Sequence, residues 1–482
     1  MFSHLIALAA RNGEQMRHIA SVLLVGLAIG IAAPAAHAQR PEEFFQRELF
    51  FEKDVRQRLE AVTPTDQKAL IEWGGFYAPS YTYFTDLGGN GGHMTLQDFR
   101  LWTQIQLDQV HRVFARMRLD YTDFAAGDAE GFRQHDLHGP NLEVGYYELN
   151  VSRAAEKHAG AKWPCEMLIR GGRQYIEVGR GIALGRILDA GWFDIETKDL
   201  AFMGFAGRTP PREENIDRSA PGYPNSRRNF YGGQLRYRGC EQHEPYGFFV
   251  IQRDWSDETP ENPFQDFRYN SQYYGVGSRG VVVKNLHYAL ESLWEFGRGA
   301  ANGQAEGLSK VRAYAFDGEL DYYFQHPLKP VATFEYGYAS GDGDRTSATT
   351  AIGGNRLGTV DTEFQGFGYV NSGLALAARF SNIQFVRLSG RATPYDNKAC
   401  GGRIDVGLDY YFLWKADREG PISDTQANRA SAELGEEVDL YVEWRILSDL
   451  SLSIRYGHFF RGAAYSFKDG QDFLFTGLNF SF

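Results

Sequence analysis

The sequence has few cysteines, few lysines and, after residue 31, no long hydrophobic run. Its three cysteines, Cys165, Cys240 and Cys400, lack C-x-x-C or other metal-ligand spacing, which argues against a zinc module or a disulfide scaffold. Mean hydropathy is −0.41, too low for a bundle of membrane-spanning helices. The net charge of −11 argues against a nucleic-acid partner. The histidines show no triad spacing with a plausible nucleophile, so we expect neither an enzyme nor a cofactor.

The apolar segment near the start of the chain is typical of a secretory signal peptide. Met16-Arg17-His18 provides a positive flank, residues 19–31 form an apolar stretch, and Ala36-His37-Ala38 fits a cleavage site. We therefore assign residues 1–38 to a signal peptide. A single membrane anchor is the alternative, but the apolar run is shorter than the ~20 residues that span a bilayer. Residues 39–70 follow as a periplasmic segment, in which residues 41–62 show helical spacing.

The sequence is rich in aromatic residues, in glycine and in alternating patterns. Aromatic side chains make up 15% of the chain, and there are 54 glycines. Apolar residues recur at every second position, as in 438–446 and 474–482. Successive side chains of a strand point to opposite faces, so each such strand has one apolar and one polar face. Cys165 shares a face with Met167 and Ile169 and is expected on the apolar side; no role is assigned to Cys240 or Cys400.

The alternation over residues 71–482 predicts an all-β fold, a transmembrane antiparallel β-barrel with apolar side chains toward lipid and charged ones toward a water-filled lumen. Short connections such as 108–110 and 447–449 alternate with long ones such as 174–190 and 340–382. This spacing gives about eighteen strands, with sixteen as the alternative, and places both chain ends in the periplasm. A soluble β-sandwich has the same alternation, but an apolar face over about 400 residues without a helical layer is long for one sandwich.

Three stretches of the sequence carry motifs that suggest a family: 169–174 with 189–194, 374–388, and 434–462. The last begins Leu434-Gly435-Glu436-Glu437-Val438-Asp439-Leu440 and includes Tyr456-Gly457-His458-Phe459-Phe460. With these motifs, the chain from about residue 70 to 482 resembles the alginate export family of bacterial outer-membrane barrels. The resemblance implies a monomeric barrel of eighteen strands, an arginine-rich constriction that selects an acidic polysaccharide, and long loops that gate the pore.

Arginine dominates the basic residues, because lysine supplies only 11 of the 50. The guanidinium group stays charged and pairs with carboxylates through two parallel hydrogen bonds, so a ladder of arginines suits a polyanion. Arginines on the polar strand faces are predicted to line the pore and bind substrate: Arg100, Arg112, Arg116, Arg118, Arg170, Arg236, Arg238, Arg387, Arg391 and Arg455. Of these, Arg116, Arg118, Arg236 and Arg238 are favoured because their own strand faces carry few acids. The alternative is structural pairing with lumen carboxylates such as Asp98, Glu335 and Glu443, which would brace the wall.

These observations predict a passive outer-membrane channel that exports an anionic, alginate-like polysaccharide. The alternatives are a general or anion-selective nutrient porin and a non-transport barrel that serves as an adhesin or structural protein. Expected partners are the polysaccharide, outer-membrane lipid and lipopolysaccharide, and periplasmic polysaccharide-secretion proteins. Asp342 and Asp344 lie in a Gly-rich segment and are calcium candidates, with a solvated external loop as the alternative.

Overall fold

The structure is a computed structural model that describes residues 69–85, 91–124, 135–211, 226–256, 268–300, 308–345, 354–397, 402–466 and 469–482. Within these ranges the chain forms eighteen β-strands and one short helix. The expected signal peptide and the helix expected at 41–62 lie outside the described residues. No helix in the described part of the chain is long and apolar enough to cross a bilayer.

The strands follow one another along the chain with short or long connections between them. The first nine are β1 (Ala69–Thr85), β2 (Gly91–Leu107), β3 (His111–Phe124), β4 (His135–Asn150), β5 (Glu166–Val178), β6 (Leu184–Glu196), β7 (Leu200–Arg208), β8 (Arg228–Tyr237) and β9 (His243–Asp254). The second nine are β10 (Tyr269–Val283), β11 (Leu286–Ala300), β12 (Leu308–Tyr323), β13 (Val331–Ala339), β14 (Ile383–Asn397), β15 (Gly402–Lys415), β16 (Glu433–Arg445), β17 (Leu450–Arg461) and β18 (Gln471–Ser481).

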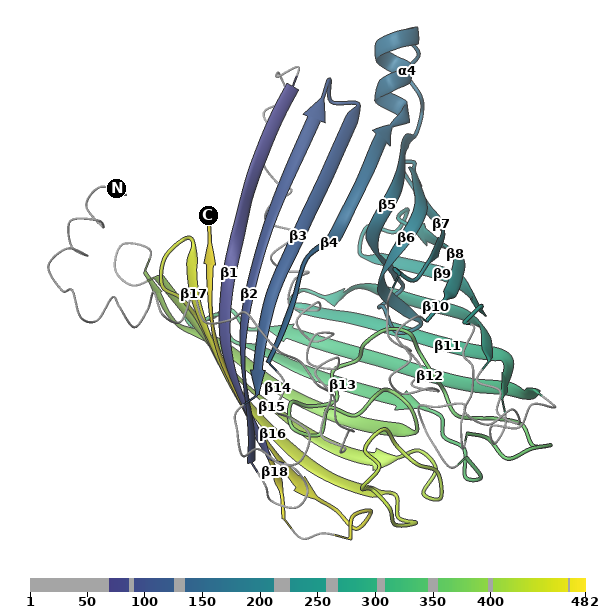
Figure 1. The fold of residues 1–482 in the computed structure, drawn as a ribbon, viewed down its shortest axis with the longest axis vertical. Coiled ribbons are helices and arrows are strands. Elements are labelled where there is room, and N and C mark those ends of the chain that lie inside the picture. The colour runs from purple at the N-terminus through teal and green to yellow at the C-terminus, as the bar shows by residue number, and fades with distance from the viewer. Residues whose placement is uncertain are drawn as a thin grey trace, which may run out of the picture. The chain divides into compact units, whose positions relative to one another are not determined.

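All eighteen strands belong to one antiparallel sheet in which each strand pairs with its neighbours in sequence (Figure 1). The ring closes where β1 pairs with β18, in a register that runs from Phe76 with Ser481 to Phe84 with Phe473. Closure leaves no free strand edge, which is the condition for a sheet to cross lipid. The expected all-β barrel of eighteen strands is confirmed, and the alternative count of sixteen is wrong.

Alternation along each strand separates a lipid-facing surface from an interior. On β12, Ala315 and Asp317 are buried inside the ring, whereas Leu320 and Tyr322 on the other face are 39% and 41% exposed. A water-soluble protein would bury most of these large apolar side chains together, so their exposure around a closed ring indicates contact with lipid.

The two ends of the barrel differ in their connections. The turn after β2 is tight, and Asp108 and Gln109 adopt left-handed φ values of 53° and 59° there. Connections at the opposite end include residues 209–227 and 340–382. Short turns are typical of the periplasmic end and long loops of the external end. The expected long loop at 174–190 is wrong, because β5 and β6 extend through it and leave only residues 179–183 as the connection.

The helix α4 (Val151–Ala159) joins β4 to β5 at the short-turn end and was not expected from the sequence (Figure 1). The Asn150 side chain caps it by accepting a hydrogen bond from the Arg153 amide at 2.9 Å. Cys165 lies in the connection between α4 and β5, so the expectation that it sits on the apolar face of a strand is wrong. Cys165 and Cys240 are free thiols, and Cys400 lies outside the described residues.

Candidate functional site

The interior of the barrel is narrowed by the connection between β13 and β14. Residues 354–382 of this connection, here called the inserted loop, pair with the inner wall at two places. The Phe367 amide donates to the Ala183 carbonyl at 3.1 Å, beside β6. At the second place, Asp361 forms a parallel bridge with Val311 on β12. Val311 lies beyond Ala315, the last residue of β12 that pairs with β13. The inserted loop therefore continues the wall for a few residues and then enters the bore.

Carboxylates on the wall hold the backbone of the inserted loop. Glu437 on β16 accepts hydrogen bonds from the amides of Ala375 at 2.6 Å and Leu376 at 2.9 Å. Glu295 on β11 accepts one from the Gln365 amide at 2.9 Å. An irregular segment buried in a bore leaves amides that need acceptors, and charged acceptors make the strongest such bonds. Inward-facing acids on opposite sides of the β13–β14 pair thus fasten the loop.

Aromatic side chains of the inserted loop pack against the wall as a small hydrophobic core. Phe367 meets Phe230 on β8, with ring centroids 5.3 Å apart, and Tyr273 on β10, at 6.1 Å. Phe380 packs against Phe385 on β14 at 6.2 Å. The loop brings apolar residues inside, so at this level the bore contains a hydrophobic core as well as charged side chains.

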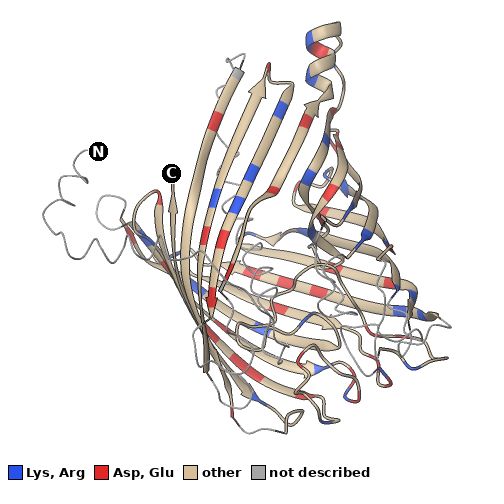
Figure 2. Cartoon of the chain, viewed as in Figure 1, with Lys and Arg blue, Asp and Glu red and all other residues tan. Residues whose placement is uncertain are grey.

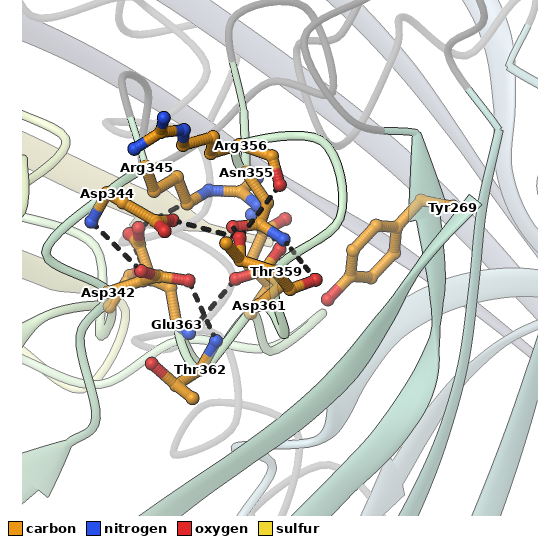
Figure 3. Close-up of polar contacts among 12 residues, drawn as sticks. Tyr269, Asp342, Asp344, Arg345, Asn355, Arg356, Thr359, Asp361, Thr362 and Glu363 are labelled. Carbon is orange, nitrogen blue, oxygen red and sulfur yellow. Dashed lines mark hydrogen bonds and ion pairs between the residues drawn. The ribbon is translucent and has the colours of Figure 1, made fainter. Parts of the chain in front are cut away.

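A buried ionic cluster joins the inserted loop to Arg345, which follows β13 in the same connection, and Figure 3 shows its members converging. Arg345 pairs with Asp361 and lies 3.3 Å from a Glu363 oxygen, while the Ser381 hydroxyl donates to Glu363 at 2.7 Å. Burial raises the pKa of Glu363 to about 8, although Arg345 acts in the opposite direction. Burial likewise raises the pKa of Asp361.

The calcium candidates belong to the same corner of the fold. Asp342 accepts hydrogen bonds from the Asp344 amide at 3.1 Å and the Thr362 amide at 3.0 Å (Figure 3). Arg345 supplies the positive charge nearby. Across the described ranges, no group of three or more His, Cys, Asp or Glu side chains is arranged to hold a metal ion. The structure thus gives Asp342 a loop-forming role.

A second inward segment, residues 179–183, meets the inserted loop from the other side. The Arg180 guanidinium lies 3.0 Å from Asp317 and 3.4 Å from Glu319 on β12. Its backbone amide donates to Glu291 on β11 at 2.7 Å. Gly368 of the inserted loop approaches so closely that an added Cβ would lie 1.5 Å from the Gly181 carbonyl oxygen. The two segments form one constriction.

A hollow beside the constriction is lined by charged and aromatic side chains, including Arg186, Tyr369 and Arg379. The sequence analysis missed these residues. Arg186 lies on β6, within the range that was assigned to a loop, and correct strand alternation would have placed it inward. Arg379 lies in a long connection whose entry into the bore has no local sequence signal.

The predicted pore arginines on β2 to β5 form a network with shared carboxylates, and Figure 2 shows basic residues on β3 beside acidic residues on β4. Asp98 lies 2.8 Å from Arg100 and 3.0 Å from Arg118. Glu143 lies 3.2 Å from Arg100 and 2.7 Å from Arg116. Glu148 lies 3.8 Å from Arg112 and 2.5 Å from Arg170. Each of these three carboxylates serves two arginines. Arg170 is also stacked between Tyr146 and Trp192.

Arg236 and Arg238 form a separate pair near the short-turn end. Arg238 lies 2.9 Å from Glu196 and 3.6 Å from Glu244, and Arg236 lies 3.5 Å and 4.0 Å from the same two acids. These arginines were favoured because their own strand carries few acids. Their carboxylate partners come instead from other strands, Glu196 from β6 and Glu244 from β9, which a search along one strand does not reveal.

The remaining predicted arginines lie on β14 and β17. Arg387 is buried among Glu335 at 2.5 Å, Glu319 at 3.3 Å and Asp409 at 3.7 Å, so this wall is acid-rich. Arg455 lies 2.7 Å from Glu443. Arg391 is exposed to the lumen and sits over the Tyr441 ring at 5.5 Å.

A closed ring of eighteen antiparallel strands, apolar toward lipid and charged within, with a loop narrowing the bore, defines an outer-membrane β-barrel channel. The sequence then identifies the family: the family model described as Alginate export matches residues 92–476, and the chain belongs to the alginate export family. The resemblance noted from the motifs is thereby confirmed.

Solved structures with a similar fold include two Pseudomonas aeruginosa proteins. OpdQ is 11% identical, with 86% of this chain and 98% of that chain covered and a TM-score of 0.50. OccK8 (OprE) is 12% identical, with the same coverage and the same TM-score. At such identities the similarity shows the fold alone. A search of curated protein sequences found no significant match.

Proposed function

We propose that this channel passively exports an anionic, alginate-like polysaccharide. The observation that carries the proposal is the arginine network on β2 to β5, where Asp98, Glu143 and Glu148 are each shared by two arginines. The five arginines of this network outnumber these three carboxylates, so this part of the wall favours anions. A polyuronate carries one carboxylate per sugar and would meet these arginines repeatedly along the wall. Family membership supports the polymeric substrate.

The arginine sites on β2 to β5 should bind a polyanion weakly enough for it to pass through the channel. Conduction requires binding that is favourable enough for entry and weak enough for exit at several adjacent sites. Partial neutralisation by Asp98, Glu143 and Glu148 weakens each arginine site without removing it. The acid-rich wall around Arg387 repels a polyanion, which favours a path along β2 to β5.

A second candidate is an anion-selective porin for small nutrients. The contact between Gly368 and Gly181 makes the constriction tight, and a tight constriction favours small solutes. Under this alternative, the hollow at Arg186 and Arg379 would bind single carboxylates. If the channel exports a polymer instead, the inserted loop has to move out of the bore.

Planar-bilayer recordings of the purified barrel separate these functions. Export predicts an anion-selective current that polymannuronate blocks and neutral dextran of equal size does not. An anion-selective current that polymannuronate leaves unchanged would support the nutrient porin. Absence of conductance would support an adhesin or structural barrel.

Charge reversal tests the arginines themselves. The four arginines favoured by the sequence should each contribute to selectivity, so their joint replacement by Glu should abolish anion preference: Arg116, Arg118, Arg236 and Arg238. The matched control reverses Arg153 and Lys157 on α4, which lies beyond the strand ends (Figure 1). A reversal potential that shifts equally in both variants, or in neither, would contradict the assignment.

A further inference from the structure

A sector of the lipid-facing surface carries cations near the long-loop ends of β11 and β12. The basic sector consists of Arg298 on β11 and Lys310 and Arg312 on β12, all exposed. Register pairs Arg298 with Lys310. Neighbouring strands are ~4.8 Å apart, and alternate residues of one strand ~7 Å, so the three side chains can converge on one group. Arg208 on β7 and Arg253 on β9 extend this sector around the barrel.

Alternation shows that these side chains point outward. On β11, Trp294 and Phe296 are 40% and 44% exposed and share the face of Arg298. Between them Glu295, which faces the bore and holds the inserted loop, is fully buried. The basic sector therefore lies on the outside of the wall, away from any transported solute.

Aromatic rings fix the depth of the basic sector in the membrane. A lower band includes Tyr322, which packs against Phe324 at 4.7 Å. An upper band includes Tyr314, which packs against Trp294 at 5.8 Å. Strand rise and a tilt of ~40° separate Tyr322 and Tyr314 by ~20 Å along the membrane normal, close to the height of an outer-membrane apolar band. Arg312 and Lys310 follow the upper band and so reach the headgroups of the external leaflet.

Among the described residues, the cations of the basic sector have no carboxylate partner. None of Arg298, Lys310 and Arg312 forms an ion pair within the part of the chain that the structure describes. This differs from the bore, where nearly every predicted arginine is paired. On the other side of the ring, outward positions near the long-loop end carry acids: Glu436 accepts a hydrogen bond from Tyr410, and Asp472 accepts one from Tyr456 at 2.7 Å.

We infer that the basic sector binds the phosphate groups of the phosphorylated glycolipid in the external leaflet, lipopolysaccharide. Guanidinium and ammonium groups at headgroup depth match phosphate oxygens, and arginine forms paired hydrogen bonds with them. The apolar band below would contact the acyl chains of the same molecule. In a chain of net charge −11, a cluster of cations that pairs with no acid among the described residues is most simply explained by an external anion.

The test is retention of glycolipid by the full-length barrel. The barrel is folded in detergent and mixed with deep-rough lipopolysaccharide bearing both lipid A phosphates, and bound copies are counted by native mass spectrometry. Each cation near a charged membrane surface contributes about a fivefold change in binding, so R298Q/K310Q/R312Q should lower affinity on the order of 100-fold. Dephosphorylated glycolipid should bind the unaltered barrel as weakly as the phosphorylated form binds the variant.

The matched control is E436Q/D472N, which changes outward charges in the acidic part of the ring and should retain the glycolipid. R298K/R312K should retain most of the binding, and heat-modifiable gel mobility verifies that each barrel is folded. If the triple Gln variant fails to fold, R298Q alone should still lower affinity about fivefold. Equal retention by the folded variant and the unaltered barrel would overturn the proposal. So would equal binding of dephosphorylated glycolipid, or displacement of the glycolipid by polymannuronate.

Discussion

Raising the pH should release the inserted loop and widen the pore, because the loop is fastened around a buried carboxyl group. Burial raises the pKa of Glu363 to about 8 when the loop is docked, against the neighbouring charge of Arg345. In a released loop this carboxyl would return to its ordinary pKa of 4.5. Docking is therefore fully favoured below pH 4.5 and weakens as the pH rises toward 8, since the docked loop must then bury a second negative charge beside Asp361.

The size of the effect follows from these two pKa values. Between pH 6 and pH 9, the Glu363 carboxyl alone should cost docking about 2.6 kcal/mol, or roughly a 100-fold change in the ratio of docked to released loop. Asp361 acts in the same direction, because burial raises its pKa too. The contacts of Glu437 and Glu295 with the loop backbone oppose release.

Single-channel recording measures this ratio directly. The unaltered barrel should spend a growing fraction of time in a high-conductance state between pH 6 and pH 9. In E363Q this side chain cannot ionise, so the fraction should rise much less over this range, with Asp361 as the remaining contributor. Identical conductance histograms at the two pH values, or an unchanged pH dependence in E363Q, would refute the assignment of Glu363 as the titrating group.

Three further substitutions test the constriction and the wall. R345M leaves the acids of the ionic cluster without their cation, which costs about 3–5 kcal/mol, so the high-conductance state should dominate already at pH 7. G368A should separate the two constriction segments and raise conductance, because its Cβ would lie 1.5 Å from the Gly181 carbonyl; G390A, where a Cβ meets nothing within 4 Å, should leave conductance unchanged. R387M removes a buried cation from among three carboxylates and should lower the free energy of unfolding by about 3–5 kcal/mol, measured as a lower urea midpoint for heat-modifiable gel mobility.

The wall of the barrel could be predicted from the sequence because a strand that meets lipid has a strict period of two. On β16, for example, Leu440 and Val442 are exposed, whereas Glu437 and Asp439 on the opposite face are buried, as alternation requires. Closure and strand number followed from the same pattern. The exception was the stretch 174–190, where Gly179 and Gly181 suggested a long loop although the strands run almost to them.

The constriction could not be predicted, because it depends on contacts between residues far apart in sequence. Nothing near Phe367 indicates that it will pack against Phe230 on β8. The arginines were placed on the correct faces, but their partners are found across strands. Glu143, for example, is the extra residue where the register of β4 shifts against β3, and there it meets Arg116. The sequence of a single strand shows which face a side chain occupies, whereas its ion-pair partner depends on the arrangement of all the strands.

The seam between β1 and β18 has a consequence for biogenesis. Phe76 cannot pair with Ser481 until β18 has been synthesised and exported. The barrel is therefore closed by a contact between the first and last described strands. Contacts between residues so far apart in sequence form slowly. Until they form, the apolar strand faces and unpaired strand edges can aggregate. Shielding of the unpaired strands before insertion should therefore limit aggregation.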